Sequence, residues 1–154
     1  MLNLRSVRSA LLLVLLALPS VALAEGTNVA FGGLRADTTL PVEVKADNLT
    51  VTQADGNAVF SGSVVVTQGE MRLTADEVRV EYSADHKEIE RLHATGNVLL
   101  VNVQDAAESD NAVYTIANGE VVMTGNVLLT QGQAAMSSER LVINLQTGTG
   151  KMDG

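Results

Sequence analysis

The chain has 154 residues, with 10 basic and 18 acidic side chains, no cysteine, no tryptophan and only two histidines. Without cysteine it can hold no disulfide, thiolate zinc site or cysteine nucleophile, and its net charge of -8 argues against a nucleic-acid-binding surface. Valine, alanine, leucine, threonine and glycine dominate, which favours a β-rich protein with an aliphatic interior.

The first segment, residues 1–24, has the three parts of a cleavable export signal. Arg5 and Arg8 precede an unbroken apolar run at residues 10–18, and small residues at 22 and 24 suit a signal peptidase. The uncharged stretch is shorter than the ~20 residues that a membrane span needs, which disfavours a retained anchor. We therefore predict cleavage before Glu25 and a soluble mature protein outside the cytoplasm, with a net charge of -10 because both arginines are removed.

The mature chain is expected to have two parts. Residues 25–39 have weak periodicity and a Gly-Gly pair, which indicates a flexible N-terminal arm. Residues 40–154 show two-residue alternation cut by turn signals and no sustained helical period, which predicts a single all-β domain. Asp55-Gly56 and Asn118-Gly119 are typical of hairpins with type I′ turns.

The chain also repeats itself. Residues 47–80 align without a gap on residues 110–143, and eleven of the 34 positions are identical. A shorter repeat has glycines at Gly62, Gly96 and Gly125, alternating with acidic positions that we expect to precede strands: Asp47, Asp76, Asp110 and Glu139. The pattern predicts stacked β units, with the glycines at bends. The last unit stops at Gly154, where the earlier units continue into another strand, so we expect either an open edge there or a clipped sequence.

Three segments are apolar on both faces: residues 64–66, 98–101 and 127–129. A sandwich buried on both sides and an inner face that lines a cavity for an apolar ligand both explain them. Catalytic constellations are missing, because no nucleophile elbow, Walker loop or dinucleotide fingerprint occurs. A metal-dependent hydrolase would need convergence of the few available ligands, and no spacing matches a known zinc site. Those ligands are His86, Glu88, Glu90, His93, Glu108 and Asp110.

Several segments resemble the OstA-like periplasmic lipopolysaccharide-transport proteins. Residues 56–69 (GNAVFSGSVVVTQG), followed by residues 71–78 (MRLTADEV), resemble the family signature. Residues 123–132 (MTGNVLLTQG) resemble it again, and residues 40–47 (LPVEVKAD) are similar to the family's first strand.

The resemblance implies a β-jellyroll of many short antiparallel strands, open along one side into an apolar groove. It implies a periplasmic lipid carrier that binds the acyl chains of lipopolysaccharide. Since catalytic and metal-site patterns are missing, we expect this carrier to be non-enzymatic and to have no cofactor or metal. Such a carrier bridges the inner and outer membranes, and its partners are the inner-membrane-anchored component, the outer-membrane translocon and further copies of itself, stacked head to tail. The cleavable signal and the short body favour the soluble bridge component of this family.

Alternation assigns candidate residues to the groove. Val42 and Val44 are expected at its entrance. The inner wall is expected to contain Leu49, Val51, Phe60, Val64, Val66, Met71, Leu73, Val78, Val80, Tyr114, Met123 and Leu129. A one-residue slip in register would turn any of these strands around. The alternative is a structural module, or the anchored component of the same system, that assembles through its edges without carrying lipid.

Overall fold

The computed structural model describes residues 27–30, 34–52 and 56–154. The predicted signal peptide lies outside the described residues. Ten strands form one antiparallel sheet in the order β1-β10-β9-β8-β7-β6-β5-β4-β2, with β3 also paired to β4. Their bounds are β1 Thr27–Ala30, β2 Glu43–Lys45, β3 Asn48–Val51, β4 Ala58–Gln68, β5 Met71–Tyr82, β6 Ile89–Asn102, β7 Asp105–Thr115, β8 Glu120–Gln131, β9 Ala134–Asn144 and β10 Thr149–Asp153. The predicted all-β fold is confirmed.

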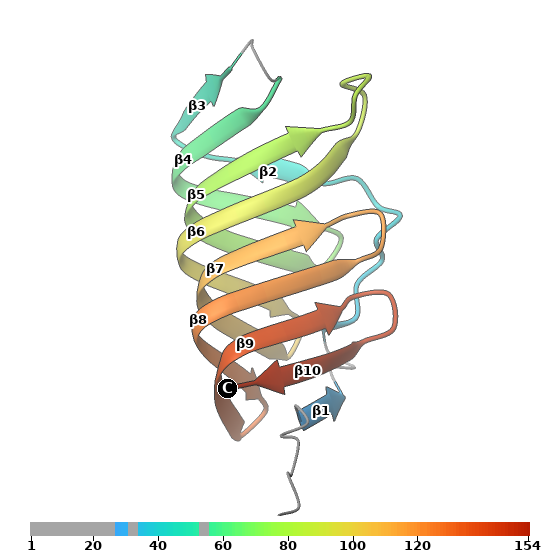
Figure 1. The fold of residues 1–154 in the computed structure, drawn as a ribbon, viewed down its shortest axis with the longest axis vertical. Helices are drawn as coiled ribbons and strands as arrows, with labels where there is room; N and C mark the ends of the chain where they lie inside the picture. The colour runs from blue at the N-terminus through green and yellow to red at the C-terminus, as the bar shows by residue number, and fades with distance from the viewer. Residues whose placement is uncertain (1–26, 31–33, 53–55) are drawn as a thin grey trace, which may run out of the picture.

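The sheet folds over on itself into two layers (Figure 1). The front layer contains β1, β3, β10 and one half of each strand from β4 to β9. The back layer contains β2 and the other half of each of those strands. Each strand from β4 to β8 changes register with its neighbour at the point where it passes from one layer to the other. Such β-bulges bend a strand and raise its twist. We call this line of bends the corner, and the opposite side, where the hairpin turns of both layers lie, the mouth.

The corner is built from the short repeat in the sequence. Gly96 and Asn97 both have positive φ values, 79° and 48°, and the pairs at 62–63 and 125–126 adopt the same conformation. A β-carbon on Gly96 would lie 2.5 Å from the Asp76 carboxylate, so only glycine fits there. Asn97 Nδ2 donates to that carboxylate at 2.9 Å. The acidic residues were predicted to precede strands; Asp76, Asp110 and Glu139 instead lie inside β5, β7 and β9, because the bulge lets the strand bend without ending.

The predicted turn at Asn118-Gly119 connects β7 and β8. Gly119 has a φ of 69°, and the Asn118 side chain accepts a hydrogen bond from the Glu120 amide at 3.0 Å. Asn118 itself does not have a positive φ, so the turn is not of type I′. The reason is that four residues, 116–119, separate the two strands, and a longer loop can turn with one left-handed residue. Asp55 of the other predicted turn lies outside the described residues.

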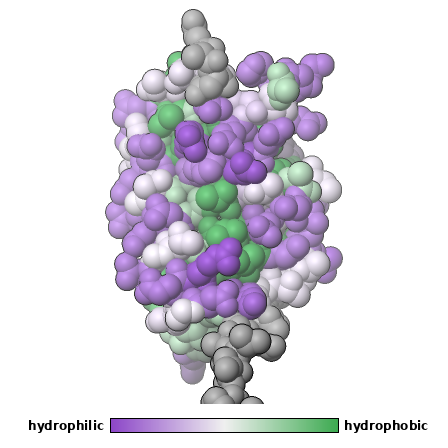
Figure 2. All heavy atoms as spheres, in the orientation of Figure 1, coloured by the Kyte–Doolittle hydropathy of each residue, from purple (hydrophilic) through white to green (hydrophobic). Residues whose placement is uncertain are grey.

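The outer surface of the front layer is mainly hydrophilic (Figure 2). A narrow apolar run lies in the middle of this face, where register places the half-buried, outward-facing Val113, Val122 and Val142 side by side. The core lies between the layers, and the middle of each strand alternates between buried and partly exposed residues. The segments at 64–66, 98–101 and 127–129 follow this alternation, with their outward side chains half-buried. The described residues contain no helix long and apolar enough to cross a membrane.

The corner generates a test of stability. We expect Gly96→Ala to lower the free energy of unfolding by about 2 kcal/mol or more, because the added methyl group is strained and also collides with Asp76. Gly132→Ala is the matched control, since Gly132 has a φ of +58° but open space around it, and it should cost about 1 kcal/mol. Chemical denaturation measures both, and equal losses would show that the contact with Asp76 is unimportant.

Candidate functional site

The space between the layers is lined by aliphatic side chains. Antiparallel partners share a face, so the register aligns Leu49, Phe60 and Val78 in the front layer, and Val44, Val66 and Leu73 in the back layer. Among the predicted groove residues, nine are buried: Val64, Val66, Met71, Leu73, Val78, Val80, Tyr114, Met123 and Leu129. Val42, Val44 and Phe60 are half-buried and pack against this core. The structure therefore brings these side chains together around one interior.

Further inward-facing residues were not predicted from the sequence. Leu141 and Ile143 are fully buried on β9, and Leu92 and Leu100 are fully or almost fully buried on β6. The 63-residue repeat contained the signal for two of them, because Leu141 and Ile143 occupy the positions of Val78 and Val80 in the second copy. Residues 98–101 are all apolar, so the sequence does not show which of them face inward. The pairing of Leu100 with the inward-facing Leu73 on β5 places Leu100 inside.

The interior is open at its β3 end. Leu49 and Val51 face the same way as Phe60 and Ala58, their partners on β4, yet they remain 56% and 60% exposed. Ala58 is buried on a strand with a paired neighbour on each side, while β3 has no strand beyond it among the described residues. Large apolar side chains are usually removed from water, so an apolar wall that continues into solvent indicates a place where another molecule can continue the core.

The mouth is polar on its back-layer side. Gln68, Asn102 and Asp105 are 1%, 4% and 8% exposed, and they lie in one row at the ends of β4, β6 and β7. Gln131 on β8 continues the row and donates to Asp105 at 3.2 Å. Buried amides have to be hydrogen-bonded, since an unpaired one costs about 1–3 kcal/mol. This row is therefore a set of donors and acceptors placed at the rim of an apolar space.

A short segment that we call the strap, residues 34–40, crosses the mouth. The expectation for residues 25–39 was a flexible arm, but the strap is packed: Leu34 is fully buried in the core, and the Ala36 amide donates to the Leu145 carbonyl at 2.9 Å. Upstream, β1 pairs with β10. The strap escaped sequence analysis because its partners lie 28 or more residues away and its own pattern is irregular.

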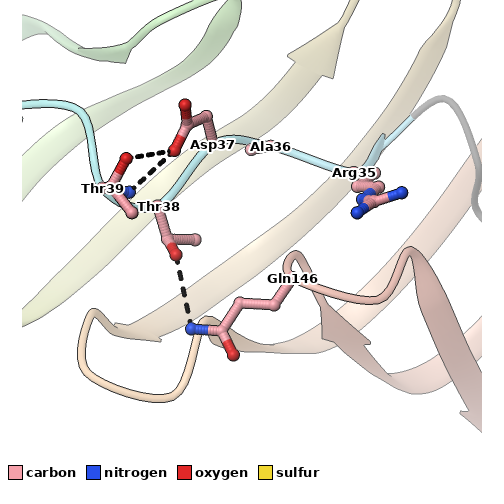
Figure 3. A pocket seen from close by; sticks show the side chains of 6 residues that line it. All are labelled: Arg35, Ala36, Asp37, Thr38, Thr39 and Gln146. Atoms are coloured by element: carbon pink, nitrogen blue, oxygen red, sulfur yellow. Dashed lines mark hydrogen bonds between the residues drawn. The ribbon is translucent and has the colours of Figure 1, made fainter.

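Side chains from both layers hold the strap. Asn102 Nδ2 donates to the Arg35 carbonyl at 2.6 Å, and Gln68 Nε2 donates to the carbonyls of Thr38 and Leu40 at 3.2 and 2.9 Å. Gln146, from the turn between β9 and β10, reaches the Thr38 hydroxyl at 3.3 Å (Figure 3). Within the strap the Asp37 carboxylate accepts hydrogen bonds from Thr39, which lower the pKa of Asp37.

Two pockets flank the strap. One of about 590 Å³ lies between the strap and Gln146, and every lining residue except Ala36 has a polar side chain (Figure 3). The other, of about 240 Å³, lies between the strap and the ends of the back layer, and Met71 and Asn102 line it. Asn102 Oδ1 is buried and has no hydrogen-bond partner among the residues that the structure describes. The second pocket is therefore lined by a side chain whose acceptor atom is unsatisfied within the described part of the chain.

Residues considered for a metal or hydrolase site do not converge in the described part of the chain. His93 lies 3.1 Å from Glu81 on the outer face of the front layer, and the His86 ring lies against Gly56. Asp110 accepts from Asn126 at the corner, while Glu108 is exposed on the outer face of the back layer. No group of three or more potential metal ligands occurs among the residues that the structure describes.

Tyr114 gives a pH-dependent test of the interior. Its hydroxyl donates to Gln68 Oε1 at 2.7 Å, and burial raises the pKa of Tyr114 to about 12. Since tyrosine in an unfolded chain has a pKa of about 10, the unfolded state releases its proton first as the pH rises. The free energy of unfolding should therefore fall by roughly 2–3 kcal/mol from Tyr114 alone between about pH 10 and 12.

Tyr114→Phe is the control, because it removes the titrating group and keeps the ring. Urea denaturation at several pH values should show a shallower alkaline loss of stability in the variant than in the wild type. Identical slopes would contradict a buried, protonated Tyr114.

Comparison with solved structures supports the fold. The crystal structure of LptH from Pseudomonas aeruginosa, described as the LptA homologous periplasmic component of the conserved lipopolysaccharide transport device, superposes with a TM-score of 0.66 and 24% sequence identity. The match covers 75% of this chain and 83% of that chain. At this identity the likeness shows the fold, and it confirms the predicted β-jellyroll.

Curated relatives match over part of their length. An uncharacterized protein of Rhizobium meliloti (strain 1021) is 26% identical over 111 residues, which is 68% of this chain and 60% of that protein. The LPS-assembly protein LptD of Actinobacillus pleuropneumoniae serotype 5b is 40% identical over 50 residues, 32% of this chain and 6% of that protein. The chain thus spans less than two thirds of either relative.

A family model covers most of the domain. The family described as LptA/(LptD N-terminal domain) LPS transport protein matches residues 43–149, which include β2 to β9 and the start of β10. Its proteins are transport proteins rather than enzymes, in agreement with the prediction for this chain. The chain belongs to the LptA/(LptD N-terminal domain) LPS transport protein family.

Proposed function

We propose that this protein is a periplasmic carrier that holds the acyl chains of lipopolysaccharide between its two sheet layers. The observation that carries the proposal is the apolar interior that runs the length of the fold and opens at β3, where the inward-facing Leu49 and Val51 are 56% and 60% exposed. Membership of a lipopolysaccharide-transport family supplies the class of ligand. The fourteen predicted groove residues are the proposed lipid contacts.

Burial of acyl chains is the driving term for binding. Each methylene removed from water contributes about 0.8 kcal/mol, so a chain of about a dozen carbons contributes enough to exceed its ordering cost. Charge works in the opposite direction, because the protein is acidic and lipopolysaccharide is anionic. We therefore expect affinity to depend on acylation far more than on the sugar, and to rise with salt.

Bridging between the two membranes is proposed to use the sheet edges. Among the described residues, 134–138 of β9 pair with β8 on one side and with no strand on the other, and β2 and β3 leave the opposite edges of the two layers unpaired. Unpaired strands present backbone donors and acceptors to another chain. The proposed partners are a second copy, the inner-membrane-anchored component and the outer-membrane translocon.

The same edges support the alternative function, an edge-assembling structural module without lipid. If the edges pair head to tail, light scattering should show a particle mass that keeps rising as the concentration is raised from about 1 to 100 μM, without levelling off at a closed oligomer. A particle that remains a monomer throughout would count against both edge pairing and the bridge. Lipid binding separates the two functions, since only the carrier takes up lipopolysaccharide.

Photocrosslinking tests which face of β3 meets the lipid. We expect a benzophenone amino acid at Leu49 to crosslink lipopolysaccharide strongly, because this side chain faces the interior and is accessible from its open end. The matched position is Thr50, which is also exposed but points to the opposite face of the same strand. Gel mobility and mass spectrometry of the adduct measure the yield. Equal yields at both positions would remove the β3 end from the lipid site.

A further inference from the structure

The strap is the one described segment that joins the two layers across the mouth through non-strand hydrogen bonds. On the front-layer side the Ala36 amide donates to the Leu145 carbonyl. On the back-layer side Asn102 and Gln68 donate to strap carbonyls at distances down to 2.6 and 2.9 Å. As long as these contacts persist, a molecule with long chains cannot pass through the mouth into the interior, which is closely packed in this state.

The contacts that hold the strap are of an exchangeable kind. Gln68 and Asn102 donate to peptide carbonyls of the strap and to no side chain of it. The ester and amide carbonyls that join acyl chains to a sugar are acceptors of the same kind, and they lie where an acyl chain leaves its polar head. Because an unpaired buried amide costs free energy, these donors favour any state in which another carbonyl replaces the strap.

The strap is also weakly anchored. Leu34 is its only fully buried side chain, while Arg35, Asp37, Thr39 and Leu40 are exposed. Segments with few buried apolar contacts open at low free energy compared with the core strands. Opening the strap therefore requires withdrawal of one leucine and transfer of a few hydrogen bonds, while the paired strands stay in place.

We propose that the strap occupies the mouth in place of an acylated ligand, and that Gln68 and Asn102 transfer their hydrogen bonds from the strap to the carbonyls of the acyl linkages when the ligand enters. The unsatisfied Asn102 Oδ1 offers a further acceptor to a hydroxyl or amide of the same ligand. This inference rests on the proposed lipid-carrier function. In this proposal the strap competes with the lipid for the mouth. The side-chain amides of Gln68 and Asn102 then favour ligands with acyl linkages over plain hydrocarbon.

Locking the strap tests the competition. The chain has no cysteine, so Thr38→Cys and Gln146→Cys, whose native side chains touch, can be joined by a short bis-maleimide with an internal disulfide. We expect the crosslinked protein to lose lipopolysaccharide binding in a gel-filtration assay, and reduction of the linker to restore it. The two single-cysteine variants treated with the same reagent are the controls, and both should bind. A crosslinked protein that binds as well as the reduced one would overturn the proposal.

Kinetics of lipopolysaccharide binding test the transfer of hydrogen bonds. Leu34→Ala removes the strap's anchor and should raise the association rate several-fold with little change in dissociation. Asn102→Leu removes a hydrogen-bond donor both from the state with the strap in the mouth and from the state with bound ligand. It should therefore raise the association rate and the dissociation rate together. Gly96→Ala destabilises the protein at the corner, away from the strap, and controls for general destabilisation, which should not speed association. An unchanged dissociation rate in Asn102→Leu would overturn the role of the amide.

The outcomes separate the two proposals. If neither the wild type nor any variant binds lipopolysaccharide while all are folded by circular dichroism, the carrier function fails, and the strap inference fails with it. If all proteins bind, including the crosslinked one, the carrier function stands and the strap inference alone is wrong.

Discussion

The corner is the constraint on which the rest of the structure depends. A long antiparallel sheet with one apolar face has to cover that face, and here each strand does so by bending into a second layer opposite the first. The bend needs two successive residues with positive φ and an acidic residue on the neighbouring strand, as at Gly96, Asn97 and Asp76. Because these elements recur along the chain, the bends stack in line, and the two halves of each strand enclose one continuous interior with a mouth on the far side.

The position of the corner explains the polarity of the site. The inward-facing residues on either side of the bend and in the middle of each strand are aliphatic and buried, so the interior suits hydrocarbon. Towards the mouth the back-layer strands end in amide and carboxylate side chains, Gln68, Asn102 and Asp105, which suit the polar end of an amphipathic molecule. The fold therefore places an apolar wall where the acyl chains of a lipid would lie and a polar rim where its polar end would lie. The strap covers that rim in the structure described.

The strands, their inward-facing residues and the corner could largely be predicted from the sequence, because the repeat consists of residues with strong local conformational preferences. The alternation in Val78 and Val80 fixed their common face, and the glycines marked the corner. Contacts between distant segments could not be predicted. Gln68 and Gln131 occupy the same place in the two copies of the Thr-Gln-Gly motif, yet Gln68 binds the strap and Tyr114, whereas Gln131 binds Asp105. Leu34 gave no periodic signal, since a single anchor residue has no pattern.

The central claim is that the space between the layers binds acyl chains. Competition against bound lipopolysaccharide tests it most directly, with lipid A and the fully deacylated saccharide as competitors in the same co-migration assay. The account predicts that lipid A displaces lipopolysaccharide stoichiometrically and that the saccharide does not, because burial of methylene groups dominates the binding free energy. Displacement by the saccharide at similar concentrations, or no binding of lipopolysaccharide by the folded protein, would contradict it.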